Sequence, residues 1–250
     1  MSTSISAPPA PEPAAPLSFV QRCAGVFFSP RETFAEIARQ PDFIGPLVIS
    51  IMASVAMTET MLTRIGMERI IRMSIERSSR ASSMSPEQIE QAVNQGAKVG
   101  AVFAHLGGLL GPAVVLLIIA GLGLLILNGI FGAQVKFATV FAVTCYANLV
   151  GILGIAMAIA VILFGDPEHF NPQDPTPSNP GFFLNPVETS RSVMALAASF
   201  DIFALWFMAL LGIGLSEATG RRVKALSIFL SYFGLWAVWV LARMGLAQLG

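Results

Sequence analysis

Charged residues are scarce in this sequence. Lysine, arginine, aspartate and glutamate make up 12% of the 250 residues, against roughly 25% in a soluble globular domain. A surface with so little charge must face something other than water, and the mean hydropathy of +0.71 agrees. The 15 basic and 15 acidic residues cancel, so the chain lacks the basic excess that binds nucleic acid.

Cysteine and histidine are equally rare. Cys23 and Cys145 lie far apart in the sequence, form no CxxC pair, and are accompanied by two histidines. This pattern indicates neither a disulfide framework nor a zinc site, and the GxSxG and HExxH motifs of hydrolases are missing. We therefore expect no metal, no cofactor and no enzymatic activity.

Long apolar runs are abundant instead. A helix needs about 20 apolar residues to cross a hydrocarbon core about 30 Å thick. Because lipid offers the backbone no hydrogen-bond partners, each spanning segment must be helical. The sequence thus predicts an all-α integral membrane protein whose membrane domain, residues 43–242, has five transmembrane helices. The expected spans are 43–63, 102–128, 137–164, 194–215 and 223–242.

The residues before the first span divide into two parts. Residues 1–16 are rich in proline and alanine and are expected to form a disordered tail. Residues 17–42 predict two short amphipathic helices, and the second follows Ser29-Pro30-Arg31-Glu32, which has the form of a capping box. These helices are expected to lie in the membrane interface, with Phe34 among the residues that face lipid. Packing against the protein's own spans is the alternative.

Two longer segments separate the spans. Residues 64–100 are charged and are expected outside the membrane, where a second capping box, Ser85 to Gln88, opens a helix that runs into the second span. The spacing of Glu68 and Arg72 predicts an ion pair within one helix. Residues 165–191 contain many prolines, which predict a loop at the membrane surface instead of a regular helix.

A few polar or small residues lie within the expected spans. Glu59, His105 and Asp201 all fall toward the same side of the membrane, where they could form a polar cluster. Such a cluster would either relay protons or ions, or hold helices together by hydrogen bonds, and Asp201 could also cap a helix. Gly107 and Gly111 form a small-xxx-small pair that permits close helix packing, within this chain or with a second copy.

Two short motifs resemble those of the Yip domain family of Ypt/Rab-interacting membrane proteins. SPRETFAEI is followed by DFIGPL (Asp42–Leu47), which is similar to the D-L-x-G-P motif that opens the first span of that family. FDIFALW (Phe200–Trp206) is similar to the D-x-F-x-x-W pattern of the fourth span in bacterial members. The matching residues are Pro30, Phe34, Asp42, Gly45, Pro46, Asp201, Phe203 and Trp206.

The resemblance implies five spans, a cytosolic N-terminus and, given the short N-terminal tail, a prokaryotic member in the bacterial cytoplasmic membrane. Eukaryotic relatives act in vesicle traffic and contact small GTPases, so GTPase binding is implied by analogy alone. Basic residues do not settle the orientation, because seven lie on the N-terminal side of the membrane and eight on the other. The near-absence of arginine and lysine from 165–191 favours a cytosolic N-terminus.

These observations favour a non-enzymatic membrane protein that organises membrane partners or shapes the bilayer. Its partners would be the lipid bilayer and other membrane proteins or a second copy of the chain. The alternative is a transporter or channel for protons or a small solute that uses Glu59, His105 and Asp201. Five spans without a visible inverted repeat fit common transporter architectures poorly.

Overall fold

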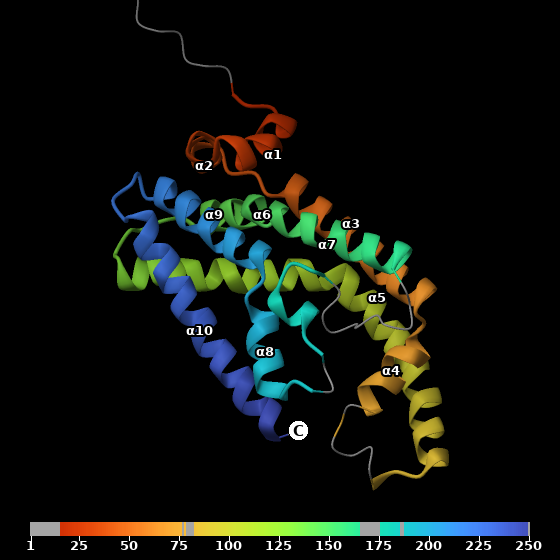
Figure 1. Cartoon of the computed structure of the whole chain (residues 1–250). Helices are drawn as coiled ribbons and strands as arrows, with labels where there is room; N and C mark the ends of the chain where they lie inside the picture. Colours follow the sequence, from red (N-terminus) through yellow and green to blue (C-terminus); the bar gives the residue numbers. More distant parts are fainter. Residues whose placement is uncertain (1–15, 77, 79–82, 166–175, 186–187, 250) are drawn as a thin grey trace, which may run out of the picture.

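The computed structural model describes residues 16–249 except 77, 79–82, 166–175 and 186–187, so the expected tail lies almost wholly outside the described part. Every regular element in the described part is helical (Figure 1). In chain order the elements are α1 (Phe19–Phe28), α2 (Pro30–Arg39), α3 (Ile44–Arg64), α4 (Met67–Glu76), α5 (Pro86–Leu124), a π-helix (Leu125–Ile130), α6 (Phe137–Ala147), α7 (Leu149–Phe164), a 3-10 turn (Pro180–Phe183), α8 (Arg191–Ser199), α9 (Ile202–Ala218) and α10 (Ala225–Leu249).

Four helical segments are long and apolar enough to cross a membrane. They are Ile44–Arg64, Pro86–Ile130, Phe137–Phe164 and Ala225–Leu246. The pair α8 and α9 gives a fifth span if the two helices are taken together, although they are bent by 45° relative to each other. The prediction of an all-α membrane protein is therefore confirmed, with four or five spans according to how this broken pair is counted.

The fourth predicted span, 194–215, is not one continuous helix. α8 ends at Ser199 and α9 begins at Ile202. Asp201 lies between them in an extended conformation, and its side chain caps the new helix. The break follows because Asp201 accepts hydrogen bonds from the next helix instead of taking a place within one.

The second span is part of a helix far longer than the bilayer requires. Pro86–Ile130 has 45 residues, about 68 Å at about 1.5 Å per residue. Both halves of the predicted capping box are present at Ser85 and Gln88. Pro112 lies within this helix, and the α5 ribbon bends along its length (Figure 1), as expected where a proline removes a backbone hydrogen bond.

The segment after the first span folds back instead of continuing straight. Gly66 has a φ of +83°, a conformation that favours glycine, and separates α3 from α4. α4 packs against α5, and Arg72 pairs with Glu90 of α5 at 2.8 Å. The expected partner of Arg72, Glu68, makes no ion pair with it among the described contacts, because the turn at Gly66 brings the acidic side of α5 within reach.

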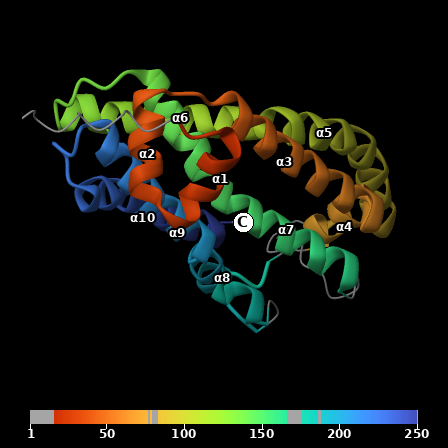
Figure 2. The same ribbon diagram turned by 90° about the horizontal axis from the view of Figure 1, so that it is seen from above.

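The core lies where α5, α6, α9 and α10 meet. Its largest completely buried side chains include Tyr146, Leu127, Leu211, Leu215 and Ile228. α3 packs against α5 and α7, and α10 packs against α8 and α9. Viewed from above, α1 and α2 form a hairpin that lies across the spans, with α2 over α6 and α9 (Figure 2).

Candidate functional site

The N-terminal hairpin begins with a cap that sequence analysis missed. Ser18 and Gln21 form a capping box in which each side chain bonds the backbone of the other residue. The capping box predicted at Ser29 is wrong, because Ser29 makes no side-chain cap hydrogen bond. Pro30 does occupy the first turn of α2 as expected, and the Thr33 hydroxyl donates to the Ser29 carbonyl. The helices cross closely at Gly25, where a Cβ would overlap Thr33.

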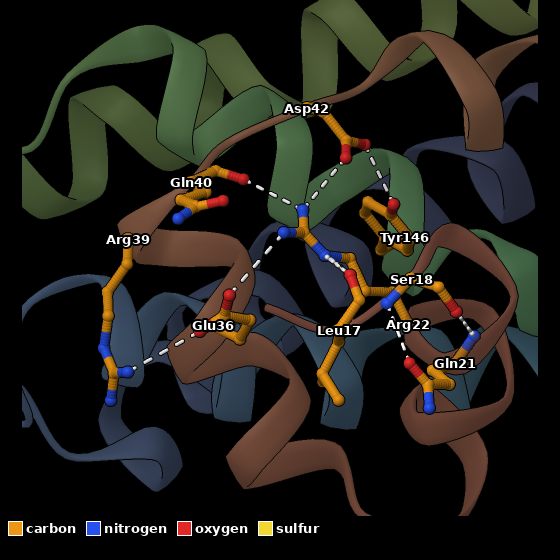
Figure 3. A network of polar contacts seen from close by, with 9 residues as sticks. All are labelled: Leu17, Ser18, Gln21, Arg22, Glu36, Arg39, Gln40, Asp42 and Tyr146. Atoms are coloured by element: carbon orange, nitrogen blue, oxygen red, sulfur yellow. Dashed lines mark hydrogen bonds and ion pairs between the residues drawn. The ribbon is translucent and has the colours of Figure 1, made fainter. Parts of the chain in front are cut away.

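A buried arginine lies at the centre of the hairpin's contact with the spans (Figure 3). The Arg22 side chain is 6% exposed. Its guanidinium pairs with Asp42 at 2.9 Å and lies 3.7 Å from Glu36. It also donates to the carbonyls of Leu17 at 3.2 Å and Gln40 at 3.0 Å. The charge is therefore compensated by two carboxylates and two carbonyls, as a buried cation requires.

Asp42 connects this arginine to a span. One carboxylate oxygen accepts from Arg22, and the other accepts from the Tyr146 hydroxyl at 2.8 Å. Tyr146 belongs to α6 and is completely buried. The contact joins residues 104 positions apart, so Asp42, a residue of the first family motif, fixes the hairpin to the membrane domain.

The thiol of Cys23 is affected by the charges of this network. Burial, and then the negative charge of Asp42, raise the pKa of its thiol above the ordinary value. Because the thiolate is the reactive form, Asp42→Asn should lower this pKa. In a Cys145→Ser background, Asp42→Asn should then move the pH profile of maleimide labelling at Cys23 to lower pH. Glu90→Gln, which removes a remote carboxylate, should leave the profile unchanged. An equal increase in the labelling rate at every pH would instead indicate a loosened hairpin and would contradict the electrostatic explanation.

Phe34 provides the apolar half of the docking contact. It is completely buried, and the nearest atoms to a Cβ built at Gly214 of α9 belong to Val143 of α6 and to Phe34 itself. The expectation that Phe34 faces lipid is therefore wrong, and the alternative of packing against the protein's own helices holds for α2. A glycine at 214 leaves the room that the ring occupies.

Two further residues of the first motif, Gly45 and Pro46, lie in the first turn of α3. Phe19 of α1 lies over Gly45, where a Cβ would overlap its ring, and Pro46 is buried at the start of α3. Trp206 of the second motif makes an edge-to-face contact with Phe27, with ring centroids 5.8 Å apart. Residues of both motifs, which begin 158 positions apart at Asp42 and Phe200, thus contact the hairpin.

Of the three polar residues predicted to cluster, two are paired in the structure, and the described contacts of the third, Asp201, are with other groups. His105 lies 2.9 Å from Glu59, and both side chains are about half exposed. Nδ1 of His105 lies 2.7 Å from the carbonyl oxygen of Ala101, which can only accept a hydrogen bond, so Nδ1 is the donor in this contact. Asp201 bonds Ser178 and the backbone N–H groups of Phe203 and Ala204 instead.

Within this chain, the glycines that pack helices are not the predicted pair, and packing of Gly107 and Gly111 against a second copy stays a prediction. A Cβ at Gly107 or Gly111 would meet nothing within 4 Å. Gly108 is the close contact, because a Cβ there would lie 2.6 Å from the Thr58 hydroxyl of α3. Gly154 of α7 packs similarly on Phe203, which belongs to the second family motif.

Sequence reasoning missed Arg22, Glu36 and Tyr146 as members of the network. A signal was available for Arg22, since it is the sole charged residue of FVQRCAGVFF. No sequence feature marks Tyr146, whose role follows from its position opposite Asp42. Among the described residues, no group of three or more histidine, cysteine, aspartate or glutamate side chains is placed to hold a metal ion.

Comparison with known proteins supports the family resemblance of the sequence. A sequence profile described as the Yip1 domain matches residues 24–244. Membrane protein YknW of Bacillus subtilis (strain 168) is 25% identical over 201 residues, which cover 80% of this chain and 80% of YknW. No solved structure gives a significant match. The chain therefore belongs to the Yip1 domain family and is a multi-pass membrane protein with a bacterial relative.

Proposed function

We propose that this protein shapes the bilayer without catalysing a reaction, by holding an apolar wedge at one face of the membrane. The observation that carries the proposal is the outer stripe of α1. Val20, Ala24 and Phe28, spaced four residues apart, are all exposed, and Phe28 is 86% exposed. The opposite side of α1 contains the buried Arg22 and Val26. α1 thus has one face for the spans and a second apolar face that nothing in the described chain covers.

The position of the hairpin suits an interfacial wedge. Phe34 contacts Gly214, four residues before the end of α9, and Val143, in the second turn of α6. The hairpin therefore lies across the spans near one end of the bundle (Figures 1 and 2). A helix buried in one leaflet through its apolar side expands that leaflet relative to the other. Docking through Arg22 and Phe34 keeps the wedge fixed to the spans.

Of the roles expected from the sequence, this geometry favours bilayer shaping. A transporter would use Glu59, His105 and Asp201 as one cluster. In the structure, the described contacts of Asp201 include neither Glu59 nor His105. A protein that organises membrane partners would use the same exposed stripe, but a partner protein would cover the stripe instead of lipid. We propose the bacterial cytoplasmic membrane as the location, since the relative YknW is a membrane protein of Bacillus subtilis.

Curvature preference tests the wedge directly. Fluorescently labelled protein reconstituted into vesicles of mixed size should be enriched severalfold per unit area on the smallest vesicles. Val20→Ser together with Phe28→Ser should abolish this enrichment, because the stripe loses its apolar side chains. Phe183→Ser is the matched control, since Phe183 is 72% exposed but lies in the 3-10 turn outside the hairpin. Equal density of the unmodified protein on all vesicles would refute the proposal.

The proposed orientation places the hairpin and the N-terminus on the cytosolic side. Two single-cysteine variants, in a background without Cys23 and Cys145, test this orientation. One cysteine replaces Arg222, in the turn between α9 and α10, and the other replaces Phe183; both positions are exposed. An impermeant maleimide should label Phe183→Cys in intact cells and Arg222→Cys after lysis alone. The reverse pattern would place the N-terminus outside.

A further inference from the structure

A cavity of about 340 Å³ lies between α3, α7 and α9. Small residues of α7, among them Gly151 and Ala158, leave the space, and Phe207 of α9 contributes to the opposite wall. These helices belong to the membrane spans, so the apolar wall lies where lipid chains are present. Among the described residues of the lining, the polar side chains are Asn148, Thr176 and Asp201, and none is basic.

Asp201 gives the cavity a negative end. One carboxylate oxygen accepts from the N–H groups of Phe203 at 2.8 Å and Ala204 at 3.0 Å. The other accepts from the hydroxyl of Ser178, which in turn contacts Thr176 at 2.8 Å. All these groups donate toward the carboxylate, as suits its charged form. Within the described part of the chain, Asp201 makes no ion pair with a lysine, arginine or histidine.

The α9 dipole compensates this charge in part, because its positive end lies at Asp201. A carboxylate oxygen that accepts one hydroxyl can still accept a further donor. A cationic group that donates hydrogen bonds would therefore complete the compensation at the cavity's polar end. A hydrocarbon chain attached to the same molecule would fill the space beside Gly151, Ala158 and Phe207.

We propose that this cavity binds one membrane lipid with a primary ammonium headgroup, whose nitrogen donates to Asp201 and whose chain lies along α7. The occupant is a lipid because the lining belongs to spans that contact the bilayer. The proposal does not depend on the wedge at α1, since the two features share no residue.

The test uses the full-length purified protein, stripped of lipid in detergent and titrated with phosphatidylethanolamine or phosphatidylglycerol of identical chains. Native mass spectrometry measures how much of each lipid is retained. Phosphatidylethanolamine should bind about tenfold more tightly than phosphatidylglycerol, because one charge-assisted hydrogen bond contributes enough free energy for that difference. Asp201→Asn keeps a residue that caps helices well but removes the charge, so it should abolish the preference.

Gly151→Leu tests the chain site, because a Cβ at Gly151 meets just the Asn148 amide oxygen, at 3.5 Å, and the longer side chain would enter the cavity. It should weaken retention of phosphatidylethanolamine to the level of phosphatidylglycerol. Gly107→Leu makes the same change where a Cβ meets nothing within 4 Å, and it should retain the lipid normally. Equal retention of both lipids by the unmodified protein, or an unchanged preference in Asp201→Asn, would overturn the proposal even if Gly151→Leu fails to fold.

Discussion

Phe34→Ala should lower the free energy of unfolding by about 3 kcal/mol, within the roughly 3–5 kcal/mol of a phenylalanine-to-alanine change in a core. The Phe34 ring is completely buried, and its removal leaves a void where α2 meets α6 and α9. Phe28→Ala is the matched control in the same hairpin, because Phe28 is 86% exposed; it should change stability by less than about 0.5 kcal/mol. Reversible unfolding in mixed micelles measures both. Equal effects would contradict the docking described for Phe34.

The same contact predicts a non-additive pair. A Cβ at Gly214 would lie 2.8 Å from Cδ1 of Phe34 and 2.5 Å from Cγ1 of Val143. Gly214→Ala alone should therefore cost about 1–3 kcal/mol by overpacking. In Phe34→Ala the ring is gone, and part of the strain is relieved. The double variant should be less destabilised than the sum of the two, with a coupling of about 1 kcal/mol. Additive costs would mean that Phe34 and Gly214 do not touch.

The example of Phe34 shows what periodicity can and cannot predict. The spacing of apolar residues correctly predicts that 30–39 is an amphipathic helix with Phe34 and Ile37 on one face. It does not say whether that face meets lipid or protein, because both are apolar and leave the same pattern. The difference lies in Gly214, 180 residues away, whose missing side chain makes room for the ring.

The spans show a similar division. Their existence follows from composition, since a long apolar run has one stable conformation in lipid. The break at Asp201 depends on whether one helix continues through this residue or a new helix begins with Asp201 as its N-cap. The sequence signals for these two outcomes differ little. Ser178 biases the outcome by bonding the carboxylate, and its position depends on how the preceding loop folds.

The glycines illustrate why spacing alone does not identify the helix contacts within one chain. Gly107 and Gly111 have the small-xxx-small spacing, yet the adjacent Gly108 packs against Thr58. A shift of one residue along a helix rotates the side chain by about 100°. The face that meets α3 is therefore decided by the packing of the whole bundle, and the presence of a glycine pair does not report it.

Asp42→Ala should undock the N-terminal hairpin. Removing one partner of a buried ion pair costs about 3–5 kcal/mol, and Asp42 is also the acceptor for the buried Tyr146 hydroxyl. Two features reduce the cost here. The Asp42 side chain is 52% exposed, and Glu36 remains 3.7 Å from the Arg22 guanidinium. We therefore expect a loss of about 2–3 kcal/mol.

Hydrogen exchange locates the effect. Amides of α1 and α2 should exchange roughly 30- to 140-fold faster in Asp42→Ala, the factor that corresponds to this free energy. The amides of α10, which the network does not touch, should keep their rates. This separates undocking of the hairpin from general destabilisation, which would accelerate both regions.

A matched control exists in the same chain. Arg72 and Glu90 form an arginine–carboxylate pair at 2.8 Å, close to the 2.9 Å between Arg22 and Asp42, but the Arg72 side chain is 39% exposed where that of Arg22 is 6%. Exposed pairs contribute about 0–1 kcal/mol, so Glu90→Ala should accelerate exchange in α4 by less than about fivefold. If the two substitutions had equal effects, burial would not govern the Arg22 pair. Asp42 would then be one surface carboxylate among others, and the hairpin would depend on Phe34 alone for its attachment.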